Sequence, residues 1–258
     1  MLNNLPQVTK NIILLNIMFF IATIVLQTQG IDLTQTLGAH YVNSPLFQPY
    51  QIVTHFFMHG GFLHILFNMY LFAILGAYLE HIWGPKRFFI FYFASAIGAF
   101  VLYNILGVYE LAQLKSEIIS QGGNISEINQ YIKDGQMGSN NLLLHYYIQM
   151  CRTPMVGASG AIFGLMAAYL VIQRHFGADT RGMLVLVGIN LVLGFFPGTN
   201  ISWQAHVGGL LTGAAIAWVY SKTRAATAGR QRALLVWLVL GVLVALTVYG
   251  VSRLVTGY

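Results

Sequence analysis

The chain has 258 residues, of which 57% are hydrophobic and only 8% are charged. Soluble globular domains carry about 25% charged residues, so this composition excludes a soluble class and predicts an integral membrane protein. The net charge of +6 is therefore interpreted as a signal of membrane topology, and no nucleic-acid partner is expected. The single cysteine, Cys151, excludes an intrachain disulfide.

Seven apolar runs predict seven membrane helices, since about 20 residues cross a bilayer. They cover residues 11–26, 55–79, 88–108, 155–172, 183–196, 201–220 and 233–251. The first run is interpreted as a retained span, because residues 27–30 lack a small-x-small cleavage site. The fifth run is short and fits either a span or a re-entrant segment.

The predicted fold is all-α, a polytopic transmembrane helical bundle. Residues 1–220 form the six-helix membrane domain, with an extracytoplasmic insertion at about 109–152. Residues 221–258 supply a cytoplasmic linker and the seventh helix. The outer segment 27–54 is rich in Gly, Pro and aromatic residues and could cover part of the protein from the interface.

Basic residues in the connections predict the orientation, because short cytoplasmic loops are enriched in Lys and Arg. With the N-terminus in the cytoplasm, nine basic residues fall inside and four outside. The inner ones are Lys10, Lys86, Arg87, Arg174, Arg181, Lys222, Arg224, Arg230 and Arg232. This arrangement indicates topology rather than a binding patch.

Polar side chains inside hydrocarbon are costly and indicate a functional site. His59, His64, Asn68, Ser159 and His206 all fall in the first turns of the second, fourth and sixth predicted helices. At about 1.5 Å per residue they share one layer roughly 5–15 Å below the outer surface. Three helices thus bring polar groups to one depth.

Ser159 and His206 are the candidate nucleophile and general base. Ser159 lies in the sequence GASGAIFG, although a serine in a membrane helix often bonds only its own backbone. A lone helical histidine is likewise often structural. The glycines around the two residues favour close approach of their helices, which would bring the imidazole to the hydroxyl. These glycines are Gly157, Gly160 and Gly164 on one helix and Gly209 and Gly213 on the other.

No acid falls inside a predicted span, so a Ser–His dyad is expected rather than a triad. His64 and Asn68 are four residues apart and share a helix face, from which they and the Ser159 amide could bind an oxyanion. His59 would lie about 140° away from His64 around the helix and is expected to have a structural role. His55 and His59 have no nearby carboxylate and no HExxH pattern, so neither a metal nor a cofactor is expected.

These motifs resemble the rhomboid family of intramembrane serine proteases. The family pattern HxxxxHxxxN matches His59, His64 and Asn68, GxSG matches Gly157 to Gly160, and AHxxGxxxG matches Ala205 to Gly213. The resemblance implies a six-helix rhomboid core followed by a seventh helix, with Ser159 as nucleophile, His206 as base, and His64, Asn68 and the Ser159 amide as oxyanion hole.

The resemblance also implies transmembrane protein substrates, a lipid bilayer partner, and the fifth helix as a lateral gate. Phe163 replaces the tyrosine that some relatives have beneath the histidine, and the insertion 109–152 is longer than expected. We expect a multi-pass protein of a bacterial plasma (inner) membrane, with its active site opening to the extracytoplasmic side. A catalytically silent, client-binding relative is the main alternative. A transporter is a third class, but the spacing lacks an inverted repeat.

Overall fold

The computed structural model describes residues 4–136, 141–196 and 201–222. The seventh predicted helix, residues 233–251, lies outside the described residues. The helices are α1 (Gln7–Gln27), α2 (Leu33–Leu37), α3 (Gln51–Thr54), the 3₁₀ turn η2 (His55–Phe57), α4 (Phe62–Trp83), α5 (Pro85–Ser120), α6 (Ile125–Asp134), α7 (Leu142–Arg152), α8 (Ser159–His175), α9 (Arg181–Leu193) and α10 (Trp203–Lys222).

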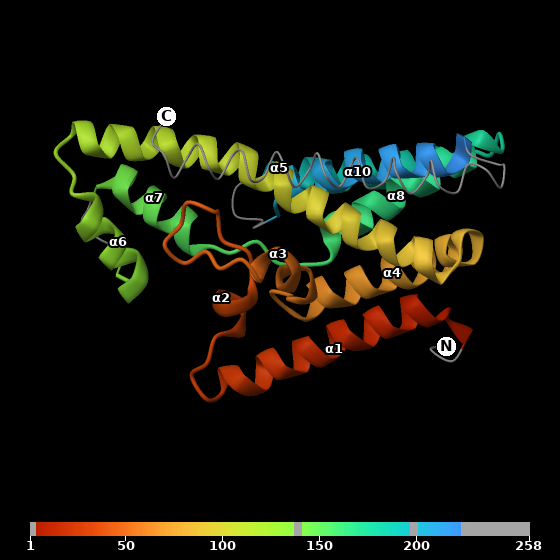
Figure 1. Ribbon diagram of the computed structural model, residues 1–258, viewed down its shortest axis with the longest axis horizontal. Coiled ribbons are helices and arrows are strands. Elements are labelled where there is room, and N and C mark those ends of the chain that lie inside the picture. The colour runs from red at the N-terminus through yellow and green to blue at the C-terminus, as the bar shows by residue number, and fades with distance from the viewer. Residues whose placement is uncertain (1–3, 137–140, 197–200, 223–258) are drawn as a thin grey trace.

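The long helices run side by side as a bundle (Figure 1). Helix α10 packs against α8 and α5, and α1 packs along α4. Helices α1, α4 and α5 are each long and apolar enough to span a membrane, and α9 is a shorter apolar helix. The all-α transmembrane bundle is therefore confirmed.

The second predicted helix begins later than its apolar run. Residues 55–57 form a 3₁₀ turn, Met58 is extended, and α4 starts only at Phe62. Gly60 and Gly61 precede this start, and consecutive glycines are poor helix formers. The placement of His55 and His59 on the second helix was therefore wrong, because both precede α4.

Helix α5 has 36 residues and is about 54 Å long, against about 30 Å for the hydrocarbon core. Its last turns, with α6 and α7, make up most of the predicted insertion 109–152 (Figure 1). The sequence ELAQLKSEII consists largely of good helix formers, which continue the helix beyond its apolar part. Helix α7 returns the chain towards the bundle and leads into α8.

Glu80 ties the end of α4 to the start of α1. Its carboxylate accepts hydrogen bonds from the backbone N–H groups of Val8 and Thr9, at 2.9 and 2.7 Å, and from the Thr9 hydroxyl at 2.8 Å. The first N–H groups of a helix have no partner within the helix, so Glu80 supplies one. Glu80 is one residue beyond the predicted span 55–79 but still within a helix, because α4 continues to Trp83.

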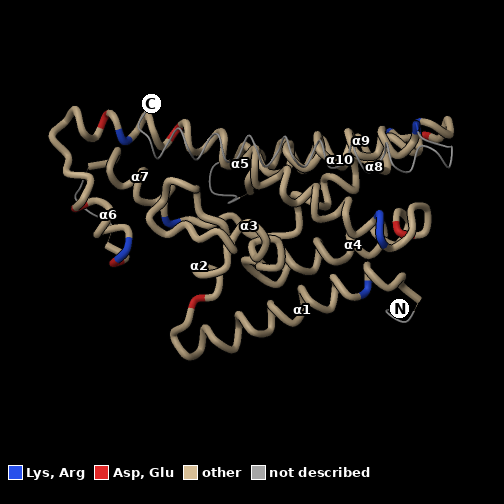
Figure 2. Tube along the Cα trace, in the orientation of Figure 1, with Lys and Arg blue, Asp and Glu red and all other residues tan. Residues whose placement is uncertain are grey.

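Basic residues mark one end of the bundle. The start of α1, the α4–α5 connection and the α8–α9 connection lie at this end and carry Lys or Arg (Figure 2). Helices α4 and α8 end at this basic end, and α9 starts there, so α4, α8 and α10 all start at the opposite end. The first turns of these three helices therefore meet away from the basic end.

Candidate active site

Ser159 is the first residue of α8, and the preceding turn depends on Gly157. Gly157 has a φ of 116°, which residues with a side chain rarely adopt. A Cβ atom at this position would lie 2.8 Å from Nε2 of His64. Glycine is thus needed both for the backbone conformation and for the space beside His64.

His206 reaches Ser159 because α8 and α10 approach each other closely. A Cβ atom at Gly209 would collide with the carbonyl of Gly160, and one at Gly213 with the backbone of Gly164. This contact of small residues places His206 Nε2 3.0 Å from Ser159 Oγ, which is hydrogen-bond distance. The two residues selected from the sequence are thus brought together.

The His206 ring lies against Phe163, one turn along α8 from the serine. The two rings are stacked, with centroids 4.0 Å apart and an interplanar angle of 13°. His206 Nδ1 is buried and has no hydrogen-bond partner within the described residues. Glu80 is 16 residues beyond His64 on α4, about 24 Å away by helical rise, and lies too far away to orient His206.

His64 and Asn68 lie on the other side of the serine, on α4. The Gly60 N–H points to His64 Nδ1 at 3.4 Å, which leaves the proton on Nε2. Asn68 Nδ2 is buried, has no hydrogen-bond partner among the described residues, and would lie 3.6 Å from a Cβ atom at Gly157. Two side-chain donors therefore point to the turn that precedes Ser159.

His59 lies beside His64, in contrast to the predicted separation of about 140°. Their ring centroids are 5.1 Å apart in an edge-on arrangement. Because His59 lies in the turn before α4, helical periodicity does not apply to it. Both of its ring nitrogens are buried without a partner within the described residues.

The segment before Ser159 is held by the loop between α1 and α4. Ala39 and Met155 pair through two backbone hydrogen bonds of 2.9 and 2.8 Å, and the Gly157 N–H donates to the His55 carbonyl at 3.0 Å. The interpretation of segment 27–54 as a cover does not include this contact. No pattern in the sequence indicates which residues of the loop take part.

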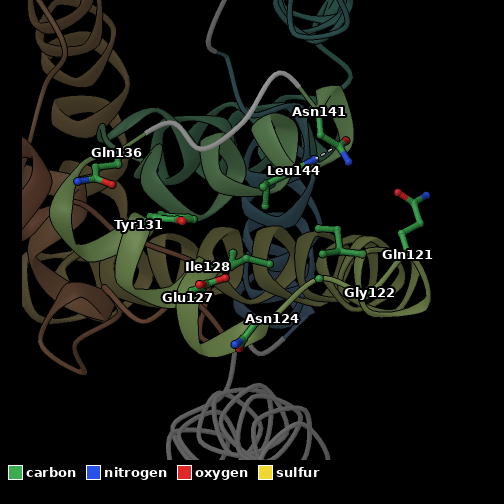
Figure 3. Close-up of a pocket in the computed structure, with 11 residues that line it drawn as sticks. Gln121, Gly122, Asn124, Glu127, Ile128, Tyr131, Gln136, Asn141 and Leu144 are labelled. Atoms are coloured by element: carbon green, nitrogen blue, oxygen red, sulfur yellow. Dashed lines mark hydrogen bonds between the residues drawn. The ribbon is translucent and has the colours of Figure 1, made fainter.

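One cavity, of about 880 Å³, lies away from these residues. It is lined by the end of α5, by α6 and by the start of α7, including Gln121, Glu127 and Tyr131 (Figure 3). Ile118 in its wall is 19 residues beyond Ala99, which contacts Gly160, and this corresponds to about 28 Å along α5. The cavity is thus separate from the Ser159–His206 pair.

Metal-ligating side chains do not gather in the part of the chain that the structure describes. No group of three or more His, Cys, Asp or Glu residues there could hold an ion. Cys151 is a free, buried cysteine near the end of α7, just before the residues that lead to Ser159. Burial raises the pKa of its thiol to about 12, which keeps it protonated and unreactive at neutral pH.

The model of the rhomboid domain matches residues 46–223, more than half of the chain. The chain belongs to the rhomboid family. The matched range includes the Ser159–His206 pair, the donors His64 and Asn68 on α4, and the glycines at the contact between α8 and α10. At the level of the family, this makes the chain a multi-pass membrane protein related to intramembrane serine proteases.

Relatives with rhomboid protease names occur in distant organisms. The putative rhomboid protease YdcA of Bacillus subtilis is 28% identical over 64% of this chain and 63% of its own length. Rhomboid-like protease 1 of Toxoplasma gondii is 26% identical over 85% of the chain and 65% of its own length. Rhomboid protease GluP of Bacillus subtilis is 27% identical over 82% of the chain but only 34% of its own length. The chain thus spans less than two thirds of these relatives.

Proposed function

We propose that this rhomboid is a serine endopeptidase that cleaves transmembrane segments of other membrane proteins with a Ser159–His206 dyad. The observation that carries the proposal is the 3.0 Å contact between Ser159 Oγ and His206 Nε2. A serine becomes nucleophilic when an adjacent base accepts its proton, and this contact has the geometry that the transfer needs.

In the first step, Ser159 Oγ attacks the carbonyl carbon of the scissile peptide bond while its proton passes to His206 Nε2. The carbonyl oxygen becomes an oxyanion and accepts hydrogen bonds from His64 Nε2, Asn68 Nδ2 and the Ser159 backbone N–H. Because Ser159 begins α8, that N–H has no partner within the helix. Fixed donors of this kind stabilise the charge that develops in the transition state.

In the second step, the C–N bond breaks, and His206 gives its proton to the leaving nitrogen. The remaining acyl-enzyme is an ester of Ser159. Water then loses a proton to His206 and attacks this ester, which releases the new carboxyl terminus and returns the proton to Ser159. Phe163 supports the imidazole from below throughout, and no acid is required.

The site opens to the extracytoplasmic side in the proposed orientation, with the N-terminus and the basic end of the bundle in the cytoplasm. The membrane is expected to be a bacterial plasma membrane. A substrate helix must unwind near its outer end to present an extended peptide bond, which is costly in lipid. Residues that weaken the substrate helix reduce this cost.

The alternative is a catalytically silent relative that binds membrane clients without cutting them. The presence of both Ser159 and His206 at hydrogen-bond distance favours the protease. The unpartnered donor of Asn68 beside the serine favours it further, because a buried donor without a partner is costly unless a ligand uses it.

Purified wild-type protein and the Ser159→Ala variant test the proposal against a tagged single-span substrate. Cleavage by the wild type is expected, with none detectable for the variant, since loss of a triad serine costs on the order of 10⁶-fold in kcat. Mapping of the cut tests its position near the outer end of the substrate helix. A fluorophosphonate probe should label the wild type but not Ser159→Ala.

Equal cleavage by both proteins would exclude Ser159 as the nucleophile. Absence of both cleavage and labelling in the wild type would favour the client-binding alternative. Labelling without cleavage would keep the serine hydrolase chemistry and show that the substrate is wrong.

A further inference from the structure

We propose that His40 is a positioning residue for Ser159, which holds the segment leading to the nucleophile through a hydrogen bond to the end of α7. The expected effect on catalysis rests on the proposed function, whereas the structural role of His40 does not. His40 lies in the outer loop after α2, and its side chain is fully buried. It is 119 positions before Ser159 in the chain and belongs to no motif of the active site.

The ring of His40 lies between two backbone carbonyl oxygens. Nδ1 is 3.0 Å from the oxygen of Cys151 in α7, and Nε2 is 3.0 Å from the oxygen of Gln35 in α2. Carbonyl oxygens only accept hydrogen bonds, and a neutral imidazole has one N–H to donate. The contact with Cys151 is the one that bears on catalysis, because α7 leads directly into the nucleophile segment.

The Cys151 carbonyl is a natural point of attachment. It is in the last turn of α7, where carbonyl groups have no partner within the helix. His40 approaches it from one direction, and the Ser44 hydroxyl donates to it at 2.9 Å. The end of α7 is thus fixed by two side chains of the same loop.

A second attachment follows directly along both segments. Ala39, next to His40, pairs with Met155 through two backbone hydrogen bonds. Gly157 is then held by the carbonyl of His55. The nine residues from Cys151 to Ser159 are therefore fixed at three places, and His40 supplies the first of them through its side chain.

The His40 ring is itself held firmly in the loop. Its backbone N–H donates at 3.3 Å to the side-chain oxygen of Gln51, a buried residue that also binds Gln48, Thr36 and Leu46. Because the backbone of His40 is fixed in the loop, its ring can hold the end of α7 at a fixed place relative to the loop. Displacement of a nucleophile by about 1 Å can reduce the rate about 10²-fold.

Two substitutions separate the contacts of the ring. His40→Asn places an amide nitrogen near the position of Nδ1 and keeps a donor for Cys151. His40→Gln places its amide nitrogen near the position of Nε2 and keeps a donor for Gln35 only. The pair removes one contact at a time, and a residue that acts only by packing would respond similarly to both.

The experiment measures kcat and KM of both variants with the single-span substrate, and amide hydrogen exchange of residues 151–159. For His40→Gln we expect kcat to fall about tenfold with KM almost unchanged, and the Met155 and Gly157 amides to exchange about tenfold faster. For His40→Asn we expect values within about threefold of the wild type. His81→Gln, at an exposed ring bonded only to its own helix, is the matched control and should change neither quantity.

Equal effects of Asn and Gln at position 40, a larger effect of Asn, or no effect of either would overturn the positioning role. Thermal unfolding of both variants shows whether a rate change reflects loss of folded protein. If the wild type neither cleaves the substrate nor takes the fluorophosphonate label, the proposed function fails, and the exchange rates alone decide whether His40 holds the segment.

Discussion

The contact of α8 with α10 and the contact of α9 with the same two helices differ sharply. The first contact is so close that a Cβ atom added at Gly209 or Gly213 would collide with backbone atoms of α8. In α9 only Val187 is buried, and neither Gly182 nor Gly188 has another heavy atom within 4 Å of such a position. The Ser159–His206 pair is thus carried by a contact with little freedom, whereas α9 is loosely attached.

This difference suits a protease that admits its substrate from the side. The chemistry needs a fixed distance of about 3 Å between two side chains, which close helix packing provides. Entry of a substrate helix needs an element that separates at low cost. Helix α9, the lateral gate that the family resemblance implies, has exposed apolar side chains at Leu184, Val185 and Ile189.

The largest effect in this comparison is expected for an added methyl group in the close contact. Gly209→Ala should lower the free energy of unfolding by about 1–3 kcal/mol, because the new Cβ atom meets the Gly160 carbonyl. Separation of α8 and α10 should also reduce kcat by more than about 10²-fold. Thermal unfolding in detergent and cleavage of the single-span substrate measure the two effects.

The matched control is Gly188→Ala on α9. It adds the same methyl group to open space, so stability should change by no more than about 1 kcal/mol, towards the more stable helix. Similar destabilisation by both substitutions would show that the two contacts do not differ as described.

A smaller effect is expected for the donors opposite the dyad. Asn68→Ala should reduce kcat about 10²-fold with little change in KM, because its Nδ2 is proposed to bind only the oxyanion. Asn190→Ala on α9 is the control, since within the described part of the chain the Asn190 amide bonds only the Leu186 carbonyl of its own helix. An Asn68→Ala enzyme with normal kcat would remove Asn68 from the oxyanion hole.

The smallest effect is expected for the ring beneath the base. Phe163→Leu keeps an apolar side chain but loses the stacking on His206. Stacking contributes about 0.5–1.5 kcal/mol, so kcat should fall about three- to tenfold. The same measurement on Phe163→Tyr shows whether the added hydroxyl is tolerated; a Leu variant as active as the wild type would make the stacking incidental.

The sequence predicted the parts of the site that depend on helical spacing and small residues. Ser159 and His206 were paired because glycines follow both along their helices, and their contact has that physical basis. His64 and Asn68 were placed together because they are four residues apart in a continuous helix. Their catalytic roles remain predictions until the variants are measured.

Other parts depend on backbone turns and on contacts distant in sequence. Helical periodicity separates His59 from His64, but it does not apply to His59, because α4 begins only after the glycine pair at positions 60 and 61. His40 is a single histidine in a loop, and its partner Cys151 is 111 residues away, so no local pattern indicates it. Hydropathy likewise marked the apolar part of α5 but not its continuation to Ser120.

The link between Glu80 and the first turn of α1 has a consequence for biosynthesis. While the chain emerges from the ribosome, α1 is complete more than 50 residues before Glu80 is added. During that interval the N–H groups of Val8 and Thr9 must bond to water or to lipid head groups. The hydrogen bonds that tie the start of α1 to Glu80 can therefore form only after the end of α4 has been synthesised.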